Sequence, residues 1–404
     1  MPISYRNSET APPIMAGSPP PQEWRVPRDA WDRAPWNRWT FQHVSEILPT
    51  ARIRHALTPS QLPEAAGRLD DVPFETPEGR STTFGEMLDD TYTDAMLVWK
   101  DGHILHESYH NGMDARSVHL LQSVSKSIVA TAAATLIEEG RLDPAAPITE
   151  VLPELEATAW KGATLQQVLD MTTGVRFDES YEQVDGDAGK LDVAAGWKLP
   201  PEGIDASGWP KSTWEQILSL TVAEAQHGER FAYRSIETDV LGHAMERVTG
   251  LKLAEVVSGR LWQPLGCVED ANIVLDPAGY GTASGGISAS LRDMARFGLA
   301  LLNDGLVEGR RVIPKAWIDD TRHGAHGLFN DSGRMTLPNG SYRNQFWIED
   351  SRLGRFMGRG VFGQLLYVMP DKGLVAVKLS TWPEFVSVNR LRRTLAALHA
   401  VAEL

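Results

Sequence analysis

Two hydrophobic patterns alternate along the chain, one typical of strands and one typical of helices. Residues 94–99 and 103–109 are apolar-rich runs separated by Lys-Asp-Gly, and such a turn between two such runs predicts a β-hairpin. The last third of the chain returns to strand-like runs and ends in a helix. These later elements are expected at 346–350, 355–357, 365–369, 374–379 and, for the helix, 388–402.

Between these strands, from 145 to 260, the pattern is mainly helical. The run 128–140 is apolar nearly all round and helix-forming, which predicts a helix buried in the core. Thr164 stands where the N-cap of a later helix is expected. Further helices are expected at 164–171, 237–249, 252–262 and 290–303. The order of elements predicts an α+β fold, in which an antiparallel sheet is built from both chain ends around an inserted, mostly α-helical region.

Three segments have no regular hydrophobic period. Residues 1–22 are rich in Pro, Ser and Gly and are expected to form a flexible arm. Residues 41–90 are expected to form short helices and loops. Residues 172–210 form a predicted long loop, and a loop of that length in a compact domain is usually functional or mobile.

These patterns divide the chain into three parts. After the arm, 23–125 and 285–404 are expected to form the α/β sheet domain, and 126–284 the inserted helical domain. Several tryptophans follow the arm, and an extended segment pinned to the body by its indoles explains them better than a ligand site does. They are Trp24, Trp31, Trp36 and Trp39.

Charge and composition disfavour several classes of function. The 404-residue chain has a net charge of −14, which disfavours nucleic acid as a partner because no excess of Lys and Arg is present to neutralise phosphates. It has no basic run typical of membrane binding, and no apolar run approaches the ~18 residues of a membrane span. No apolar signal region is seen at the N-terminus, so the expected location is cytoplasmic. The single cysteine, Cys267, is expected to be a buried small hydrophobe.

Ser123 and Lys126 are the strongest candidates for catalysis. They stand three residues apart at the start of the apolar helix, so they share a helix face and can make contact. Free N–H groups and partial positive charge at the helix N-terminus would lower the pKa of Lys126 and bind an oxyanion. An amine beside a serine can make its hydroxyl nucleophilic. Ser-x-x-Lys alone is short and Ser123 could simply cap the helix, but a lysine in such apolar surroundings is unusual without a task.

Two further segments could complete such a site. Tyr233, 110 residues after the serine and near a helix start, can relay protons if a cation holds its pKa near neutral. Residues 358–361, Gly-Arg-Gly-Val, are expected to open a C-terminal strand whose N–H group would complete an oxyanion hole. The glycine-rich turn 283–288 suggests close backbone approach but lacks the Gly-Lys-[ST] of a phosphate loop.

Taken in order, Ser-x-x-Lys, Tyr-x-Ser and a glycine-bearing strand resemble the serine hydrolases of the β-lactamase/penicillin-recognising fold, class C type. That family has Ser-x-x-Lys, Tyr-x-Asn and Lys-Thr-Gly or His-x-Gly at these places. The resemblance covers roughly residues 90–385. Similar accessory segments are 165–174, 283–298 and 362–373.

Within that family the chain resembles the 6-aminohexanoate-dimer (nylon oligomer) hydrolases. This resemblance implies a site in the cleft between the sheet and the helical region. It also implies ester hydrolysis, with amide hydrolysis of ω-amino-acid oligomers in some members. The stretches that carry it are 36–41, 92–95, 123–127, 233–241, 246–251 and 378–383.

The resemblance implies a role for each matched residue. Ser123 is the nucleophile, Lys126 the base or proton carrier, and Tyr233 the acid that protonates the leaving group. The N–H groups of Ser123 and Val361 form the oxyanion hole. Residues implied to bind substrate are Tyr181, Asp192, Ser235, Gly360 and Arg359.

Two positions differ from the family pattern, and two charged residues could bind a charged group of the substrate. Asp192 lies in the loop that closes over substrate in those hydrolases and could pair with a substrate ammonium. Ser235 replaces the Asn of Tyr-x-Asn. Gly358 stands where relatives have Lys or His, so no side chain there can polarise Tyr233. This weakens a β-lactamase assignment, because in β-lactamases the position helps to hold a substrate carboxylate. Arg359 could bind a carboxylate in a bidentate pair, although adjacent strand residues face opposite ways.

The function predicted is that of a serine hydrolase of small carboxylic esters or linear amides, such as 6-aminohexanoate oligomers, acting through an acyl-enzyme on Ser123. The alternatives are a β-lactamase, DD-peptidase or D-aminopeptidase, or a non-catalytic binding protein that keeps the fold. A Ser-His-Asp hydrolase is disfavoured because no Gly-x-Ser-x-Gly is present. No cofactor or metal is expected, since His323 and His326 lack a matching carboxylate cluster. The expected partner is a small-molecule substrate, and the expected state is a monomer or homodimer.

Overall fold

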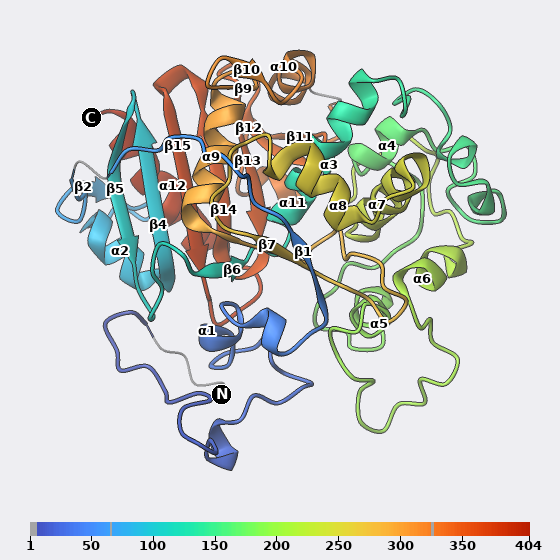
Figure 1. Cartoon of the computed structure of the whole chain (residues 1–404), viewed down its shortest axis with the longest axis horizontal. Helices are drawn as coiled ribbons and strands as arrows, with labels where there is room; N and C mark the ends of the chain where they lie inside the picture. Colours follow the sequence, from blue (N-terminus) through green and yellow to red (C-terminus); the bar gives the residue numbers. More distant parts are fainter. Residues whose placement is uncertain (1–5, 65–66, 325–326) are drawn as a thin grey trace.

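A seven-stranded antiparallel sheet is the largest sheet of the protein (Figure 1). The computed structural model describes residues 6–64, 67–324 and 327–404. The strand order of the seven-stranded sheet is β11-β12-β13-β14-β15-β4-β5. The hairpin of β4 and β5 therefore pairs with β15, the last strand of the chain. The strands are β4 (Thr93–Lys100), β5 (His103–Tyr109), β11 (Ser341–Arg343), β12 (Phe346–Asp350), β13 (Arg355–Gly360), β14 (Gln364–Met369) and β15 (Leu374–Ser380). Both chain ends build the sheet, which confirms the expected arrangement.

Helices cover both faces of this sheet because its central strands alternate between two apolar cores. In β4, Ala95 and Leu97 belong to the core that contains α9, whereas Met96 and Val98 belong to the core that contains α12 and α2. All four side chains are fully buried. The helices are α2 (Phe84–Asp90), α9 (Leu291–Leu302) and α12 (Val388–Ala402).

The inserted helical region is organised around α3 (Val124–Glu138). Of its 15 residues, 12 are buried, and its run of alanines lets α7 (Ile236–Thr249) pack closely against it. The predicted helix at 164–171 is confirmed as α4, where the Thr164 hydroxyl accepts a hydrogen bond from the Gln167 N–H at 3.2 Å. The other helices are α1 (Asn37–Thr40), α4 (Leu165–Leu169), α5 (Asp187–Ala194), α6 (Thr213–Ser219), α8 (Leu253–Val257), α10 (Lys315–His323) and α11 (Asp331–Arg334).

A second antiparallel sheet, of four strands in the order β1-β7-β8-β6, was not predicted. The expectation of only helices and loops for 41–90 is wrong, because β1, β2 and β3 lie there. Each of these strands has three or four residues, too few for a clear alternating pattern. Likewise α5 lies within the predicted loop 172–210. The remaining strands are β1 (Thr50–Ile53), β2 (Pro73–Glu75), β3 (Ser81–Thr83), β6 (Val118–Leu120), β7 (Ala271–Val274), β8 (Ile287–Ser290), β9 (Leu306–Val307) and β10 (Arg310–Arg311).

The segment 358–361 closes a strand, and the prediction that it opens one is wrong. β13 ends at Gly360, and Val361 begins a single 3-10 turn that leads into β14. Phe362 in that turn has a φ of 60°, a left-handed conformation that reverses the chain. The two glycines interrupt the apolar pattern within β13, which is why the sequence placed a boundary there.

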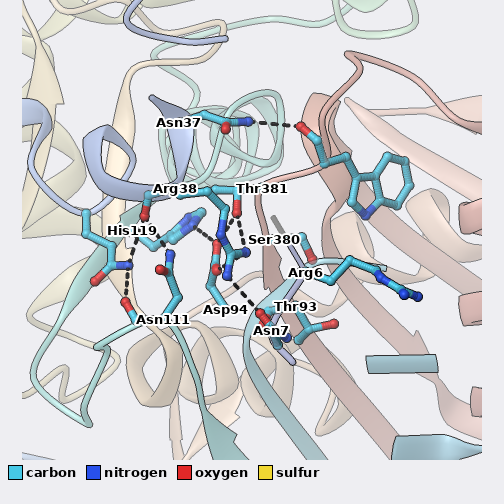
Figure 2. Close-up of polar contacts among 12 residues, drawn as sticks. Arg6, Asn7, Asn37, Arg38, Thr93, Asp94, Asn111, His119, Ser380 and Thr381 are labelled. Atoms are coloured by element: carbon cyan, nitrogen blue, oxygen red, sulfur yellow. Dashed lines mark hydrogen bonds and ion pairs between the residues drawn. The ribbon is translucent and has the colours of Figure 1, made fainter. Parts of the chain in front are cut away.

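A buried polar network ties the N-terminal segment to the sheet (Figure 2). The Arg38 guanidinium donates to Asp94 Oδ1 at 2.8 Å, to Thr381 Oγ1 at 2.9 Å and to Asn7 Oδ1 at 2.9 Å. His119 Nε2 lies 3.2 Å from the other oxygen of Asp94. These five residues come from the arm, α1, β4, β6 and the end of β15, so the network fastens distant parts of the chain to one another.

The segment that follows the arm is held by an indole, as predicted. Trp31 is fully buried and donates from Nε1 to the Trp197 carbonyl at 2.7 Å, while Trp24 and Trp36 meet edge to face. Cys267 is fully buried, which confirms its expected place in the core. Among the described residues, no helix is long and apolar enough to cross a membrane.

Candidate active site

Ser123 and Lys126 meet at the start of α3. Gln122, just before the serine, has a φ of 49°, which turns the chain sharply out of the β6 segment and into the helix. One helical turn later, Lys126 Nζ lies 2.9 Å from Ser123 Oγ. The contact expected from the spacing of the two residues is therefore present.

Lys126 is held from two further sides. Its Nζ lies 3.1 Å from Ser235 Oγ, which precedes α7, and 2.5 Å from the carbonyl oxygen of Ser284. The glycine-rich turn that carries Ser284 brings this carbonyl into the site, and the Ser284 N–H donates to Asp239 Oδ1 at 3.1 Å. The close backbone approach expected of that turn thus supplies a hydrogen-bond acceptor for Lys126.

Burial controls the ionisation of these groups. Loss of water lowers the pKa of Lys126 to about 8, although the nearby carboxylates of Glu179 and Asp239 favour its charged form. Burial raises the pKa of Asp239 to about 6, while its hydrogen bonds to Ser284 and the charge of Lys126 oppose the rise. At pH 7 about a tenth of Lys126 is therefore an uncharged amine, and this fraction grows as the pH rises towards 8.

Tyr233 lines the same cavity as Ser123. Burial raises its pKa, which a hydrogen bond to Ser123 partly opposes, so the phenol is protonated at neutral pH. Its ring stacks on Trp347 with a centroid separation of 5.3 Å, and Lys126 Nζ lies 5.3 Å from its centroid. A protonated phenol, an amine and a hydroxyl thus converge at one point.

Glu179 completes this cluster, and the sequence analysis did not select it. It accepts hydrogen bonds from the Ser235 N–H at 2.8 Å, from the Ser235 hydroxyl, and from the Tyr181 hydroxyl at 2.8 Å. The only signal in the sequence was an acidic residue two places before Tyr181 in a long loop. Its contacts bring the predicted loop residue Tyr181 and the helix-start residue Ser235 together.

The end of β13 approaches the start of α3 so closely that glycine is required. A Cβ on Gly360 would lie 2.6 Å from the Leu121 carbonyl oxygen, and one on Gly358 would lie 3.0 Å from Ser127 Oγ. The position at which relatives carry Lys or His therefore has little room for a longer side chain here. Val361, the next residue after Gly360, lines the same cavity as Ser123.

Two cavities meet at Ser123. The larger, of about 260 Å³, is walled by Tyr233, Trp347, Arg359 and other residues, many of them apolar. The smaller, of about 70 Å³, is walled by Asp192, Ser235 and others. The residues common to both are Ser123, Glu179, Tyr181 and Val361. The serine hydroxyl therefore stands between two compartments, as a nucleophile does when the two halves of a substrate lie on either side of it.

A family model for beta-lactamase matches residues 82–401 of the chain. The chain belongs to the beta-lactamase family. It is 38% identical over 360 residues to a 6-aminohexanoate-dimer hydrolase from Paenarthrobacter ureafaciens, a match that covers 88% of each chain. Esterase EstB from Burkholderia gladioli is 31% identical over 161 residues, which is 39% of each chain.

Solved structures show the same relationship. A protein assigned to the 6-aminohexanoate-dimer hydrolases, from Bacillus anthracis, superposes with a TM-score of 0.84 at 28% identity, and the match covers 95% of this chain and 98% of that one. The α+β, beta-lactamase-like fold expected from the sequence is thereby confirmed. The protein is a hydrolase of the beta-lactamase family.

In this beta-lactamase-family hydrolase the implied partner of a substrate ammonium is already paired. Asp192 Oδ2 lies 2.9 Å from Lys198 Nζ, which also lies 3.0 Å from Asp32 Oδ2. Burial raises the pKa of Asp192, and the charge of Lys198 opposes this rise. The carboxylate predicted to meet a substrate cation thus shares one lysine of the protein with Asp32.

Arg359 faces away from Gly358, as the alternation of a strand requires, and this direction leads to the larger cavity. Its guanidinium carbon lies 4.5 Å from the centroid of the Trp347 ring. The same cavity is lined by Ser123 and Tyr233. The structure therefore places this arginine on the wall of the cavity that contains Ser123, which the alternation rule by itself did not indicate.

Metal ligands are not gathered in the described part of the chain. Among residues 6–64, 67–324 and 327–404, no group of three His, Cys, Asp or Glu side chains could hold a metal ion. Of the two histidines considered in the sequence, His323 lies at the end of α10 and His326 lies outside the described residues. The groups at Ser123 act chemically as an amine, hydroxyls, a phenol and carboxylates.

Proposed function

We propose that the protein is a serine hydrolase that cleaves small carboxylic esters and linear amides such as 6-aminohexanoate oligomers through an acyl-enzyme on Ser123. The observation that carries this proposal is the contact of 2.9 Å between Lys126 Nζ and Ser123 Oγ, in surroundings that lower the pKa of the lysine to about 8. The identity to a 6-aminohexanoate-dimer hydrolase over most of the chain supports the substrate class.

In the first step the neutral amine of Lys126 takes the proton of the Ser123 hydroxyl. Ser123 Oγ then forms a bond to the substrate carbonyl carbon, and the carbonyl electrons move to the oxygen. The N–H groups of Ser123 and Val361 stabilise that oxyanion, because both residues line the cavity at the helix start and at the end of β13.

Tyr233 then protonates the leaving alcohol or amine as the tetrahedral intermediate collapses to the acyl-enzyme. The lysine ammonium, 5.3 Å from the tyrosine ring, stabilises the phenolate and returns the proton to it. Water next attacks the acyl group, gives one proton to the Lys126–Tyr233 pair, and the pair returns one proton to Ser123 Oγ. Atoms and charge balance, and the enzyme is regenerated.

The experiment that tests this proposal measures hydrolysis of p-nitrophenyl acetate and of the linear 6-aminohexanoate dimer by the wild type and by Ser123→Ala. Ser207→Ala, at an exposed loop serine, is the matched control. We expect Ser123→Ala to lose hydrolysis of both substrates and Ser207→Ala to keep it. Ester cleavage alone, lost in Ser123→Ala, would restrict the proposal to a carboxylesterase. Ester cleavage that survives in Ser123→Ala would overturn the assignment of the nucleophile.

A further inference from the structure

Arg359 is a cation without an anion. Its Nη1 atom is shielded from solvent and has no hydrogen-bond partner, and no ion pair joins its side chain to any residue in the described ranges. Its guanidinium packs over the Trp347 ring at 4.5 Å. A buried guanidinium group normally pairs with a carboxylate or phosphate, because the loss of its hydration is costly.

The charge of Arg359 persists despite its surroundings. Burial lowers its pKa to about 10, and the neighbouring Tyr233 opposes that change. The guanidinium is therefore protonated at neutral pH and carries five N–H donors in a planar fork. A carboxylate that enters the cavity could accept two parallel hydrogen bonds from that fork.

The position of Tyr233 decides which half of the substrate meets this arginine. The proposed acid must lie beside the leaving group, and Tyr233 lines the larger cavity, as Arg359 does. The smaller cavity, with about 70 Å³, then receives the acyl half. Arg359 is thus placed to meet the alcohol or amine product.

The carboxylates near Ser123 already have partners within the protein. Asp192 is paired with Lys198 at 2.9 Å, and Glu179 accepts hydrogen bonds from Ser235 and Tyr181. Arg359 is the charged side chain of the larger cavity that has neither a hydrogen bond nor an ion pair among the described residues, and it lies on the leaving-group side.

We propose that Arg359 binds a carboxylate carried by the leaving group, so that the favoured substrates are esters and amides formed from hydroxy acids or amino acids with a free carboxylate. This inference rests on the proposed function. It goes further by naming the charge that selects the substrate and the half of the substrate that bears it. The amine half of a 6-aminohexanoate dimer carries such a carboxylate, and the aromatic wall of the cavity suits an apolar spacer.

The test compares 4-acetoxybenzoate with 4-acetoxybenzamide, whose leaving groups have similar size but differ in charge. The carboxamide withdraws electrons more strongly and makes the better leaving group, so intrinsic reactivity opposes the expected preference. We expect the wild type to hydrolyse the carboxylate with a kcat/KM about tenfold or more higher, as a charge-assisted bidentate pair allows. In Arg359→Met, which keeps an apolar stem over Trp347, the ratio should fall to one or below, because only the intrinsic reactivity then remains.

Two further variants make the comparison specific. Arg359→Lys keeps the charge without the fork and should retain a reduced preference for the carboxylate. Arg352→Met removes a largely exposed arginine, whose side chain is 76% accessible, and should keep the wild-type ratio. A wild-type ratio near one, or a high ratio that survives in Arg359→Met, would overturn the proposal.

A binding measurement separates failure of this inference from failure of the proposed function. Calorimetry should show that Ser123→Ala binds 4-hydroxybenzoate, and that it binds 4-hydroxybenzamide about tenfold more weakly. Adding Arg359→Met to this variant should abolish the difference in affinity. This result needs no turnover. If ester hydrolysis survives in Ser123→Ala, the nucleophile is wrong while the binding difference still decides the role of Arg359. Equal binding of the two ligands to Ser123→Ala would overturn the carboxylate site.

Discussion

Burial and two nearby carboxylates change the pKa of the Lys126 amine in opposite directions. Desolvation is the larger effect and lowers the pKa to about 8, and the charges of Glu179 and Asp239 keep it from falling further. A general base works best when its pKa lies near the working pH, because it is then both deprotonated and basic. The cluster around Ser123 meets this condition without any histidine.

The pH dependence of the reaction should report that lysine. Because only the unprotonated amine can accept the Ser123 proton, kcat/KM for p-nitrophenyl acetate should rise with pH to a plateau, with a midpoint near 8. Lys126→Arg, whose side chain stays protonated, should lower kcat/KM by about 10²–10⁴-fold. A profile with the same midpoint in Lys126→Arg would assign the ionisation to another group.

Glu179 should set the position of that midpoint. Its negative charge favours the protonated form of Lys126, so Glu179→Gln, which keeps the shape and one acceptor oxygen, should move the midpoint to lower pH. Glu182→Gln, at an exposed residue of the same loop, is the control and should leave the profile unchanged. A pH–rate profile of each variant makes the comparison, and an upward shift in Glu179→Gln contradicts the argument.

At the scale of elements, the site depends on the contact between the end of β13 and the start of α3. These elements are far apart in sequence, and glycine at 360 allows the strand to approach the Leu121 carbonyl. The same approach brings Val361 to the cavity that contains Ser123. The proposed oxyanion hole is therefore a property of how two elements pack.

Gly360→Ala should disturb that packing. The new Cβ would lie 2.6 Å from a backbone oxygen, so the strand end must move. We expect a loss of about 1–3 kcal/mol in the free energy of unfolding, as for other overpacked sites, and a fall in kcat of about 10²-fold from the misplaced donor. Gly208→Ala, where nothing lies within 4 Å of the new atom, is the control for both measurements. Equal kcat in Gly360→Ala and the wild type would exclude the strand end from catalysis.

At the scale of the whole molecule, the network around Arg38 and Asp94 holds the N-terminal segment, the adjacent strands β4 and β15, and β6 together (Figure 2). Both charged groups are buried, with 4% and 0% of their side chains accessible. Burial raises the pKa of Asp94, but Arg38 and His119 outweigh it, and the net pKa is lowered. The folded protein therefore stabilises the ionised form of this carboxylate.

Asp94→Asn should destabilise the protein strongly, because it leaves Arg38 buried without its anion. A loss of about 3–5 kcal/mol in the free energy of unfolding is expected, measured by denaturant titration at neutral pH. The contribution is present above the unfolded-state pKa of the carboxyl and is lost as the pH falls through the lowered folded-state pKa, so the wild type and Asp94→Asn should converge in acid. Asp71→Asn, at an exposed residue, is the control; equal stability of all three proteins would contradict the argument.

Long helices and strands were predicted correctly from the sequence, whereas short strands were missed. The long runs that became β4, α3, α7 and α12 were recognised, because a period repeated over several turns or pairs is a strong local signal. The four-stranded sheet was missed because its strands have three or four residues and derive their stability from partners. The assigned domain boundaries and the roles of the site residues remain predictions.

By itself the sequence determined the antiparallel sheet built from both chain ends, the buried helix that begins with Ser123 and Lys126, and the pairing of those two residues. These follow from local periodicity and from the geometry of one helical turn. Tertiary structure alone decided that Glu179 joins Ser235, that Lys198 pairs with Asp192, and that Arg359 lines the cavity of Ser123 without an ionic partner among the described residues. Each of these depends on the approach of segments far apart in the chain, and no hydrophobic period or motif spacing specifies which charges such an approach leaves paired.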